Sequence, residues 1–200
     1  MRDSKEHILK TSFSLFLQKS FKEVTMNDLV NAAGLSKGAF YHYFDSKEKL
    51  YIEVINTFFF DRMQIDYDKL NHNSLREFYH GYVREIIKLL NEANEYLNFE
   101  DTKAKMNFFM MMFDALNVFP GFRDKIIAMH KTEHDAWTKV IKMSRGKGEF
   151  ISPMSDEQIA RMFIYSNDGI GLHLLLDGDL ETIDKEMLNL WNNFYKELLD

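Results

Sequence analysis

The stretch TMNDLVNAAGLSKGAFYHYFDSKEK, residues 25–49, decides how the rest of the chain is interpreted. Thr25 and Asp28 have the spacing of a capping box, which predicts the start of a helix. The apolar residues that follow stop at Gly34, and glycine readily adopts the left-handed conformation that closes a helix. Ser36 then predicts the N-cap of a second short helix. Two short helices joined by a tight glycine turn predict a helix-turn-helix, a DNA-reading device.

The composition sets the class of protein. The chain has 200 residues, of which 46% are hydrophobic, enough for one or two globular domains with a full core. It has no cysteine, which excludes disulfides and a thiolate nucleophile. The N-terminus alternates in charge, and no stretch approaches the roughly 18 apolar residues that a membrane span needs. We therefore expect a soluble, cytoplasmic protein without a signal peptide.

The charge is distributed unevenly along the chain. The net charge is -6, yet residues 1–50 contain eight Lys and Arg against six Asp and Glu, and the remainder contains 17 against 25. A mildly basic N-terminal module on an acidic body suits a protein that contacts phosphates at one end only. Because the excess is small, DNA affinity would depend on well-placed contacts and on two copies of the module.

Helical periodicity and the scarcity of proline predict an all-α fold of about nine helices. We expect a helix-turn-helix DNA-binding domain over residues 1–46 and a helical ligand-binding and dimerisation domain over 47–200. The helix that starts near Ser46 is expected to run to about Leu70, from the DNA-binding module into the body. Apart from the two short helices of the helix-turn-helix, the other predicted helices cover about 4–20, 75–98, 102–118, 122–144, 156–176 and the C-terminal stretch.

Residues 8–50 resemble the N-terminal DNA-binding domain of the TetR family of transcriptional regulators. The resemblance lies in the segments ILKTSFSLFLQKSF, VTMNDLVNAAGLSKGAFYHYF and DSKEKL. The body is similar to the family only in layout, with further helices and a GxGEF loop before the last two. The resemblance implies a repressor-like homodimer, a palindromic double-stranded DNA operator and a small-molecule pocket in the body.

In a helix-turn-helix the second helix enters the major groove with its N-terminal residues at the base edges. Lys37 can donate to guanine or to a phosphate, and the Ala39 methyl can touch thymine. The resemblance gives Tyr41 and His42 contacts to phosphates or base edges, although both could be ordinary surface residues. Phe40, Tyr43 and Phe44 are expected in the core. The predicted DNA-binding residues are Thr25, Ser36, Lys37, Gly38, Ala39, Tyr41, His42, Lys47 and Lys49, of which Lys49 best matches the family's phosphate-binding position.

The last two helices each have a wide apolar stripe. Such faces can simply cover the body of the protein. In the family, however, these two helices pair with the same helices of a second protomer as a four-helix bundle, which agrees with the need for two DNA-binding modules. The predicted dimer interface comprises Ile159, Phe163, Ser166, Ile170, Leu174, Met187, Trp191, Phe194 and Leu198.

The run of Phe and Met over residues 106–119 is the candidate ligand pocket. Methionine is flexible and polarisable, and a helix that is apolar on nearly all faces is expected to be buried between others. Packed core is the plain alternative. We expect a largely apolar ligand with one or two polar groups. The predicted lining residues are Arg62, Tyr82, Met106, Phe109, Met110, Phe113, Asn117, His134 and Trp137.

Two other interpretations remain open. The segment HKTEH, residues 130–134, matches the HxxEH pattern of zinc peptidases, with His130 and His134 as ligands and Glu133 as base. No third ligand stands out by spacing, and a solvated helix face explains the segment equally, so we expect neither an enzyme nor a bound metal or cofactor. The nearer alternative is a DNA-binding regulator that has no small-molecule inducer.

Overall fold

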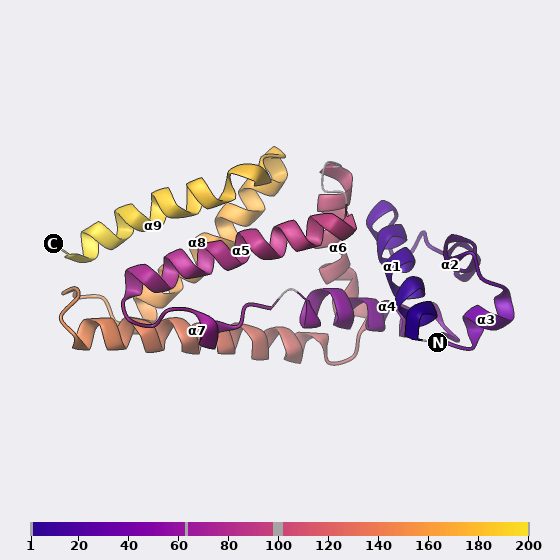
Figure 1. Ribbon diagram of the computed structural model, residues 1–200, viewed down its shortest axis with the longest axis horizontal. Helices are drawn as coiled ribbons and strands as arrows, with labels where there is room; N and C mark the ends of the chain where they lie inside the picture. The colour runs from indigo at the N-terminus through magenta and orange to yellow at the C-terminus, as the bar shows by residue number, and fades with distance from the viewer. Residues whose placement is uncertain (1, 63, 98–101, 200) are drawn as a thin grey trace. The chain divides into compact units, whose positions relative to one another are not determined.

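The computed structural model describes residues 2–62, 64–97 and 102–199, and the side chains of 4–62, 64–93 and 107–199. Within these ranges the chain forms nine α-helices and no strand, which confirms the expected all-α class (Figure 1). None of the described helices combines the length and apolar character needed to cross a membrane. The helices are α1 (Arg2–Gln18), α2 (Met26–Ala33), α3 (Lys37–Tyr41), α4 (Lys47–Ile55), α5 (Leu75–Leu97), α6 (Thr102–Val118), α7 (Phe122–Gly146), α8 (Asp156–Asp177) and α9 (Ile183–Leu199).

The chain divides into two compact units. Unit 1 consists of Met1–Gln64 and Asn91–Arg123, and unit 2 consists of Ile65–Leu90 and Asp124–Asp200. Helices α1 to α4 and α6 therefore lie in unit 1. The domain boundary between residues 46 and 47 stays a prediction.

The capping signals of the helix-turn-helix are confirmed. The Thr25 hydroxyl accepts a hydrogen bond from the Asp28 N–H at 3.2 Å, and the Asp28 carboxylate accepts one from the Thr25 N–H at 2.9 Å. Gly34 ends α2 with φ of 63°, in the left-handed region. Ser36 begins α3, because its hydroxyl accepts from the Ala39 N–H at 3.3 Å. These bonds satisfy helix-end N–H groups that have no partner inside the helix.

An aromatic core holds the module together in unit 1. Phe40 of α3 is fully buried. The ring of Tyr51 in α4 lies 4.9 Å from Phe16 and 4.6 Å from Phe21. The Tyr51 hydroxyl donates to the main-chain carbonyl of Met111 in α6 at 2.8 Å, so the DNA-binding module and α6 share one core.

The predicted continuous helix from Ser46 to about Leu70 is wrong. Helix α4 ends at Ile55 and continues as one wider π-helical segment, η1 (Asn56–Asp61), before the chain leaves the helical path. Three consecutive phenylalanines of η1 pack against three different partners. Phe58 stacks on Phe13 at 4.3 Å, Phe59 stacks on Phe108 at 4.9 Å and Phe60 meets Phe122 edge-on at 5.6 Å. This packing outweighs the local preference for a longer α-helix.

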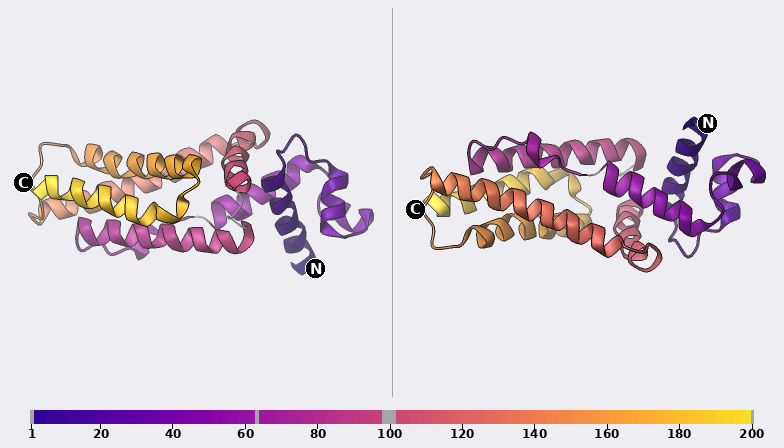
Figure 2. Two further views of the ribbon diagram at one scale, coloured as in Figure 1. Left: turned by 90° about the horizontal axis from the view of Figure 1, so that it is seen from above. Right: turned by 90° about the horizontal axis from the view of Figure 1, so that it is seen from below.

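Unit 2 is built from helices that run side by side, α7, α8, α9 and the first part of α5 (Figures 1 and 2). Their shared core is aromatic: Trp137 stacks on Phe163 at 4.8 Å, and Trp191 lies edge-on to Trp137 at 5.6 Å. Two short 3-10 turns, η2 (Tyr67–Lys69) and η3 (Leu180–Thr182), complete the unit.

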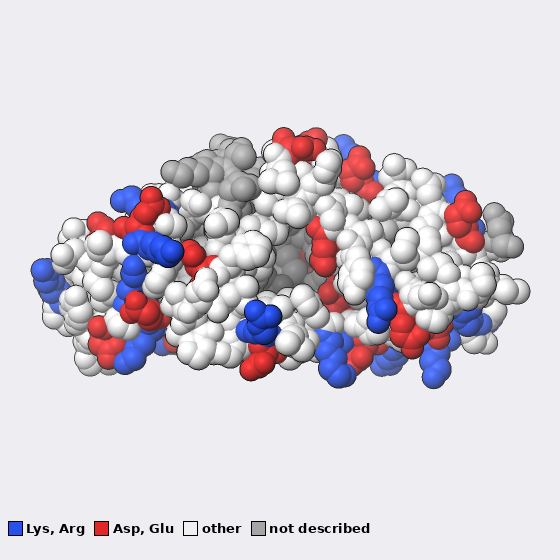
Figure 3. Space-filling model, turned by 180° about the vertical axis from the view of Figure 1, so that it is seen from behind, with Lys and Arg blue, Asp and Glu red and all other residues white. Residues whose placement is uncertain are grey.

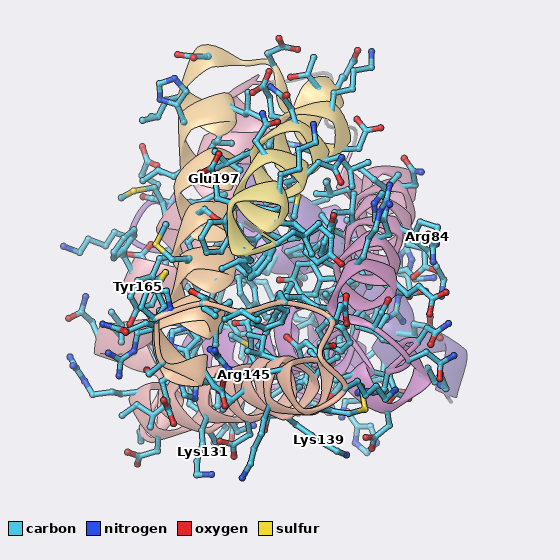
Figure 4. The ribbon with its side chains drawn as sticks, turned by 90° about the vertical axis from the view of Figure 1, so that its left-hand side faces the viewer. Arg84, Lys131, Lys139, Arg145, Tyr165 and Glu197 are labelled. Carbon is cyan, nitrogen blue, oxygen red and sulfur yellow. The ribbon has the colours of Figure 1, made fainter. Side chains whose placement is uncertain are left out.

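Two charged side chains fix the connections of unit 2. The Glu149 carboxylate accepts from the Leu75 N–H at the start of α5 at 3.0 Å and from the Tyr195 hydroxyl at 2.9 Å. The Arg145 guanidinium donates to Asp156 at 2.8 Å and to two carbonyls of the loop before α8 (Figure 4). Because charge-assisted bonds of this kind are strong, they set where the helices begin.

The two glycines of the helix-turn-helix provide a matched test. Gly34→Ala should lower the free energy of unfolding by about 1 kcal/mol, because alanine at positive φ is strained. Gly38→Ala should cause no such loss, since Gly38 lies inside α3 and a Cβ there meets no heavy atom within 4 Å. Urea unfolding followed by circular dichroism compares the two variants, and an equal loss in both would contradict the assigned role of Gly34.

Candidate functional site

The exposed face of α3 carries most of the residues predicted to contact DNA. Ser36, Lys37, Gly38, Ala39, Tyr41 and His42 are all exposed, and Tyr41 keeps 43% of its surface open to solvent. Phe40 and Phe44 point into the core as expected, and Tyr43 is half-buried. The structure therefore brings six predicted contact residues onto one free surface while the aromatic residues between them hold it in place.

Lys47 has an internal role that sequence reasoning missed. Its ammonium donates to the carbonyls of Phe21 and Val24, both at 2.7 Å, and lies 4.2 Å from the centre of the Phe21 ring. These contacts tie the start of α4 to the loop between α1 and α2. We therefore propose that Lys47 positions the module, and its contact with DNA stays a prediction.

Lys49 and Thr25 remain at the surface. The Lys49 ammonium pairs with the Asp45 carboxylate at 2.6 Å, and both side chains are about two-thirds exposed. The hydrogen bond from Lys49 holds the pKa of Asp45 below its usual range. An exposed pair of this kind contributes little to stability, so a phosphate can replace Asp45 at small cost. The Thr25 hydroxyl is already used within the capping box, where it donates to Asp28 at 2.7 Å.

Net charge alone does not mark a DNA-binding surface. On the face shown in Figure 3, Lys and Arg side chains are interspersed with Asp and Glu. Binding must therefore rest on particular side chains placed against particular phosphates and bases.

The residues predicted to line one ligand pocket fall in both units. Arg62, Phe109, Met110, Phe113 and Asn117 belong to unit 1, whereas Tyr82, His134 and Trp137 belong to unit 2. The side chain of Met106 lies outside the described residues.

Over residues 107–118, the part of α6 whose side chains the structure describes, one face is buried and the other is exposed, which corrects the expectation that the helix is buried on nearly all sides. Phe108, Met111 and Ala115, at helical spacing, are buried in the contact with α1 and α4. Met110 is 48% exposed and Phe113 is 59% exposed. Asn107 of α6 fixes the contact by donating to the Leu17 carbonyl at 2.7 Å.

The structure has a hollow of about 550 Å³ on unit 2, between α8 and the start of α9. None of the predicted ligand residues lines it. Its lining residues are Gly169, Ile170, His173, Leu174, Asp177 and Glu186.

The HxxEH segment gains no support as a zinc site. His130 is exposed, and the Glu133 carboxylate accepts a hydrogen bond from the Tyr82 hydroxyl at 3.0 Å. Among the residues that the structure describes, no three His, Asp or Glu side chains are grouped so that they could hold a metal ion. The two histidines share one helix, and the described residues supply no third ligand of the kind that a zinc hydrolase requires.

The predicted dimer residues require a correction. Ile159, Phe163, Leu174, Met187, Trp191 and Leu198 are buried in the core of the protomer itself, and Ser166, Ile170 and Phe194 are partly buried. The Trp191 indole N–H donates to the Ser166 hydroxyl at 2.9 Å within that core. Side chains already packed inside one protomer are not available to a second copy.

A second apolar stripe on α8 faces outward instead. Tyr165 points away from unit 2 (Figure 4) and is 65% exposed, while Leu176 is 60% exposed. This set, which we call the outer α8 stripe, has the spacing of a heptad repeat, and that spacing was the signal available in the sequence. It consists of Met162, Tyr165, Gly169, Leu172 and Leu176.

A short recognition helix with a free polar face, a capped glycine turn and a supporting aromatic core define a helix-turn-helix DNA-binding protein. Residues 8–54 match the family described as bacterial regulatory proteins, tetR family. The N-terminal module of the chain is therefore similar to the DNA-binding domain of TetR-family transcriptional regulators.

Relatives are similar to the chain over this same module, and solved structures share its fold. The chain is 46% identical to the regulator YerO of Bacillus subtilis over 54 residues, 27% of this chain and 19% of YerO. It is 40% identical to the repressor NemR of Escherichia coli over 53 residues, 26% of this chain and 27% of NemR. A regulator from Saccharomonospora viridis, solved in complex with choline, has the same fold with a TM-score of 0.67 at 16% identity, covering 98% of this chain and 97% of that one.

Lys49 and Lys47 make a matched pair for testing the interface. Lys49→Met should weaken binding to every DNA sequence and flatten the slope of log affinity against log salt by about one unit, because one phosphate contact is lost. Lys47→Met should instead lower the free energy of unfolding by about 1–3 kcal/mol, because two carbonyls lose their donor. Fluorescence anisotropy at several salt concentrations, with urea unfolding alongside, measures both effects. If Lys47→Met flattened the slope of log affinity against log salt and left the free energy of unfolding unchanged, Lys47 would contact a phosphate instead.

Proposed function

We propose that this protein is a DNA-binding transcriptional repressor that binds a palindromic operator as a homodimer and releases it when a small molecule binds unit 2. The exposed face of α3, held by the buried Phe40, is the observation that carries the proposal. Its relatives YerO and NemR are an HTH-type regulator and an HTH-type repressor, and they match it across this module. The proposed place of action is the cytoplasm, where bacterial DNA is accessible.

The contacts follow from the chemistry of the exposed face. Lys37 suits guanine or a phosphate, the Ala39 methyl suits a thymine methyl, and Tyr41 and His42 suit the backbone. Gly38 leaves the start of α3 without a side chain, so the helix can approach the groove closely. Lys49 exchanges Asp45 for a phosphate.

Dimerisation through the outer α8 stripe supplies the second helix-turn-helix module. Two modules double the number of contacts, which a weakly basic module needs. In the dimer the two α3 helices would enter successive major grooves about 34–36 Å apart.

The effector acts only through a difference in its affinity for two conformations. A ligand that binds better when the two α3 helices are wrongly spaced therefore lowers operator affinity. The solved regulator from Saccharomonospora viridis was crystallised with a small organic molecule, choline, which supports a small-molecule effector here. The chain passes between the units at residues 64–65, 90–91 and 123–124, so three segments can transmit the change. A regulator controlled without an inducer is the second candidate, favoured by the exposure of Met110 and Phe113 outside any described pocket.

Selection of bound DNA from a random pool tests the proposed function directly. We expect an enriched palindrome whose half-site centres are about 10 base pairs apart, or a multiple of this, because a two-fold dimer reads each half-site once. Lys37→Ala should relax the preference at one position in each half-site. Enrichment without symmetry, or no enrichment, would contradict the proposed dimeric operator complex.

The outer α8 stripe can be tested by a charge placed within it. Leu172→Glu, combined with Leu176→Glu, should convert the dimer into monomers at micromolar concentration and weaken operator binding, because a charge in an apolar interface is costly. Ile127→Glu is the matched control, since Ile127 is 58% exposed on α7 and lies outside the stripe. Sedimentation velocity measures the state of each variant. A monomeric wild type, or equal dissociation of the control, would overturn this interface.

A further inference from the structure

Helix α6 lies beside α1 within unit 1 and holds both the end of α1 and the loop that leads to α2 (Figure 1). The Leu17 carbonyl lies in the last turn of α1, where carbonyl groups have no partner inside the helix. It accepts a hydrogen bond from the Asn107 amide of α6 at 2.7 Å. The N–H of Phe21, in the loop, donates to the Asp114 carboxylate of α6 at 3.4 Å. These two bonds, which we call the α6–loop contact, join α6 to main-chain groups of the DNA-binding module.

Phe21 is also held from a second direction. Its carbonyl accepts from Lys47 of α4 at 2.7 Å, and its ring lies 4.6 Å from the Tyr51 ring of α4. Both Leu17 and Phe21 are buried. Buried main-chain polar groups are nearly always paired, because an unpaired one has given up water without a replacement. The loop therefore cannot move relative to α6 and α4 without breaking bonds that are costly to lose.

The groups of α6 that hold the module lie on one helix face. Asn107, Met111 and Asp114 have the i, i+4, i+7 spacing that places residues in one stripe. The Met111 carbonyl accepts from the Tyr51 hydroxyl at 2.8 Å. Burial raises the pKa of Tyr51, and the charge of Asp114 adds to that rise, so the Asp114 carboxylate lies close to this hydroxyl. One face of α6 thus contacts α1, the loop and α4 together.

The loop sets where the recognition helix lies. Thr25, the N-cap of α2, follows Phe21 by four residues, and α2 leads through the turn at Gly34 to α3. The proposed DNA complex needs α3 at the base edges while Lys49, at the start of α4, is at a phosphate. Hydrogen bonds to base edges tolerate little displacement. A loop that shifts against α4 therefore moves α3 relative to Lys49 and weakens the sequence-specific contacts first.

We infer that Asn107 and Asp114 are positioning residues of the DNA-binding module. Through the main chain at Leu17 and Phe21 they set the place of α2 and α3, and a displacement of α6 lowers the affinity for the operator by this route. The route runs through the loop between α1 and α2 and not along α4 alone. This inference rests on the proposed function and names the contact through which α6 regulates it.

An isosteric substitution removes one bond of the α6–loop contact. Asn107→Asp keeps the shape of the side chain but replaces the donor to the Leu17 carbonyl with an acceptor. The affinity of the full-length protein for its selected operator should fall about tenfold, while its affinity for a scrambled duplex stays within about twofold. Asn91→Asp is the matched control, because it adds the same charge at an exposed position of unit 1. Fluorescence anisotropy measures both duplexes. Equal operator affinity in the two variants, or an equal loss on both duplexes, would overturn the positioning role of Asn107.

Asp114 gives a test in which charge and position predict opposite signs. Asp114→Leu removes a negative charge, which by itself strengthens binding to any DNA. It also removes the acceptor of the Phe21 N–H, whereas Asp114→Asn removes the same charge and keeps an oxygen that can accept. We expect the Leu variant to bind the operator about fivefold more weakly than the Asn variant. This pair keeps the inference testable if Asn107→Asp does not fold. Equal operator affinity in the two Asp114 variants would contradict the positioning role of Asp114.

Amide hydrogen exchange separates this inference from the proposed function, because it needs no DNA. Peptides of α2 and α3 should exchange at least about fivefold faster in Asn107→Asp than in Asn91→Asp, while peptides of α8 and α9 exchange at the same rate in both. A wild type that binds no operator overturns the proposed function, and the exchange rates of α2 and α3 still decide whether the α6–loop contact positions the module. Unchanged exchange in α2 and α3, or faster exchange in α8 and α9 as well, would overturn the inference.

Discussion

The recognition helix α3 has five residues, too few to be stable on its own in water. Its position depends on the burial of Phe40 beneath it and on the Ser36 cap at its start. Phe44 extends that anchorage into the turn that follows. Everything the protein does at DNA therefore depends on a tertiary core. A change that loosens the core reaches the reading face without touching any exposed residue.

The same core extends beyond the helix-turn-helix. Lys47 holds the loop between α1 and α2 through two carbonyls, and α6 closes the far side through Tyr51 and Asn107. The helix-turn-helix module is thus one part of a larger packed unit, and α6 contacts the module directly. Helix α6 packs against α1 and α4 on one side and is exposed on the other. Its exposed residues include Met110 and Phe113.

Local sequence signals predicted the helix-turn-helix well, because its capping hydrogen bonds join residues that are three positions apart. Thr25 pairs with Asp28, and Ser36 pairs with Ala39. Long-range packing was not predictable in the same way. The phenylalanines of η1 pack against residues far away in the sequence, and the periodicity of apolar residues does not identify those partners. Helix α8 has two apolar stripes of similar spacing, around Phe163 and Leu172, and only the neighbouring helices decide which one is buried. The hydrogen bond between Tyr82 and Glu133 also escaped prediction, since the two residues come from separate segments, α5 and α7.

The exposed positions of α3 have almost no part in packing. Gly38 has open space where a side chain would be, and Lys37, Ala39 and Tyr41 point away from the core. Substitutions at these positions therefore change what the helix reads without weakening the fold that presents it. In evolutionary terms, a duplicated copy of this gene can acquire a new preference for DNA sequence by drift on one helix face, while the sequence of the other unit stays unchanged.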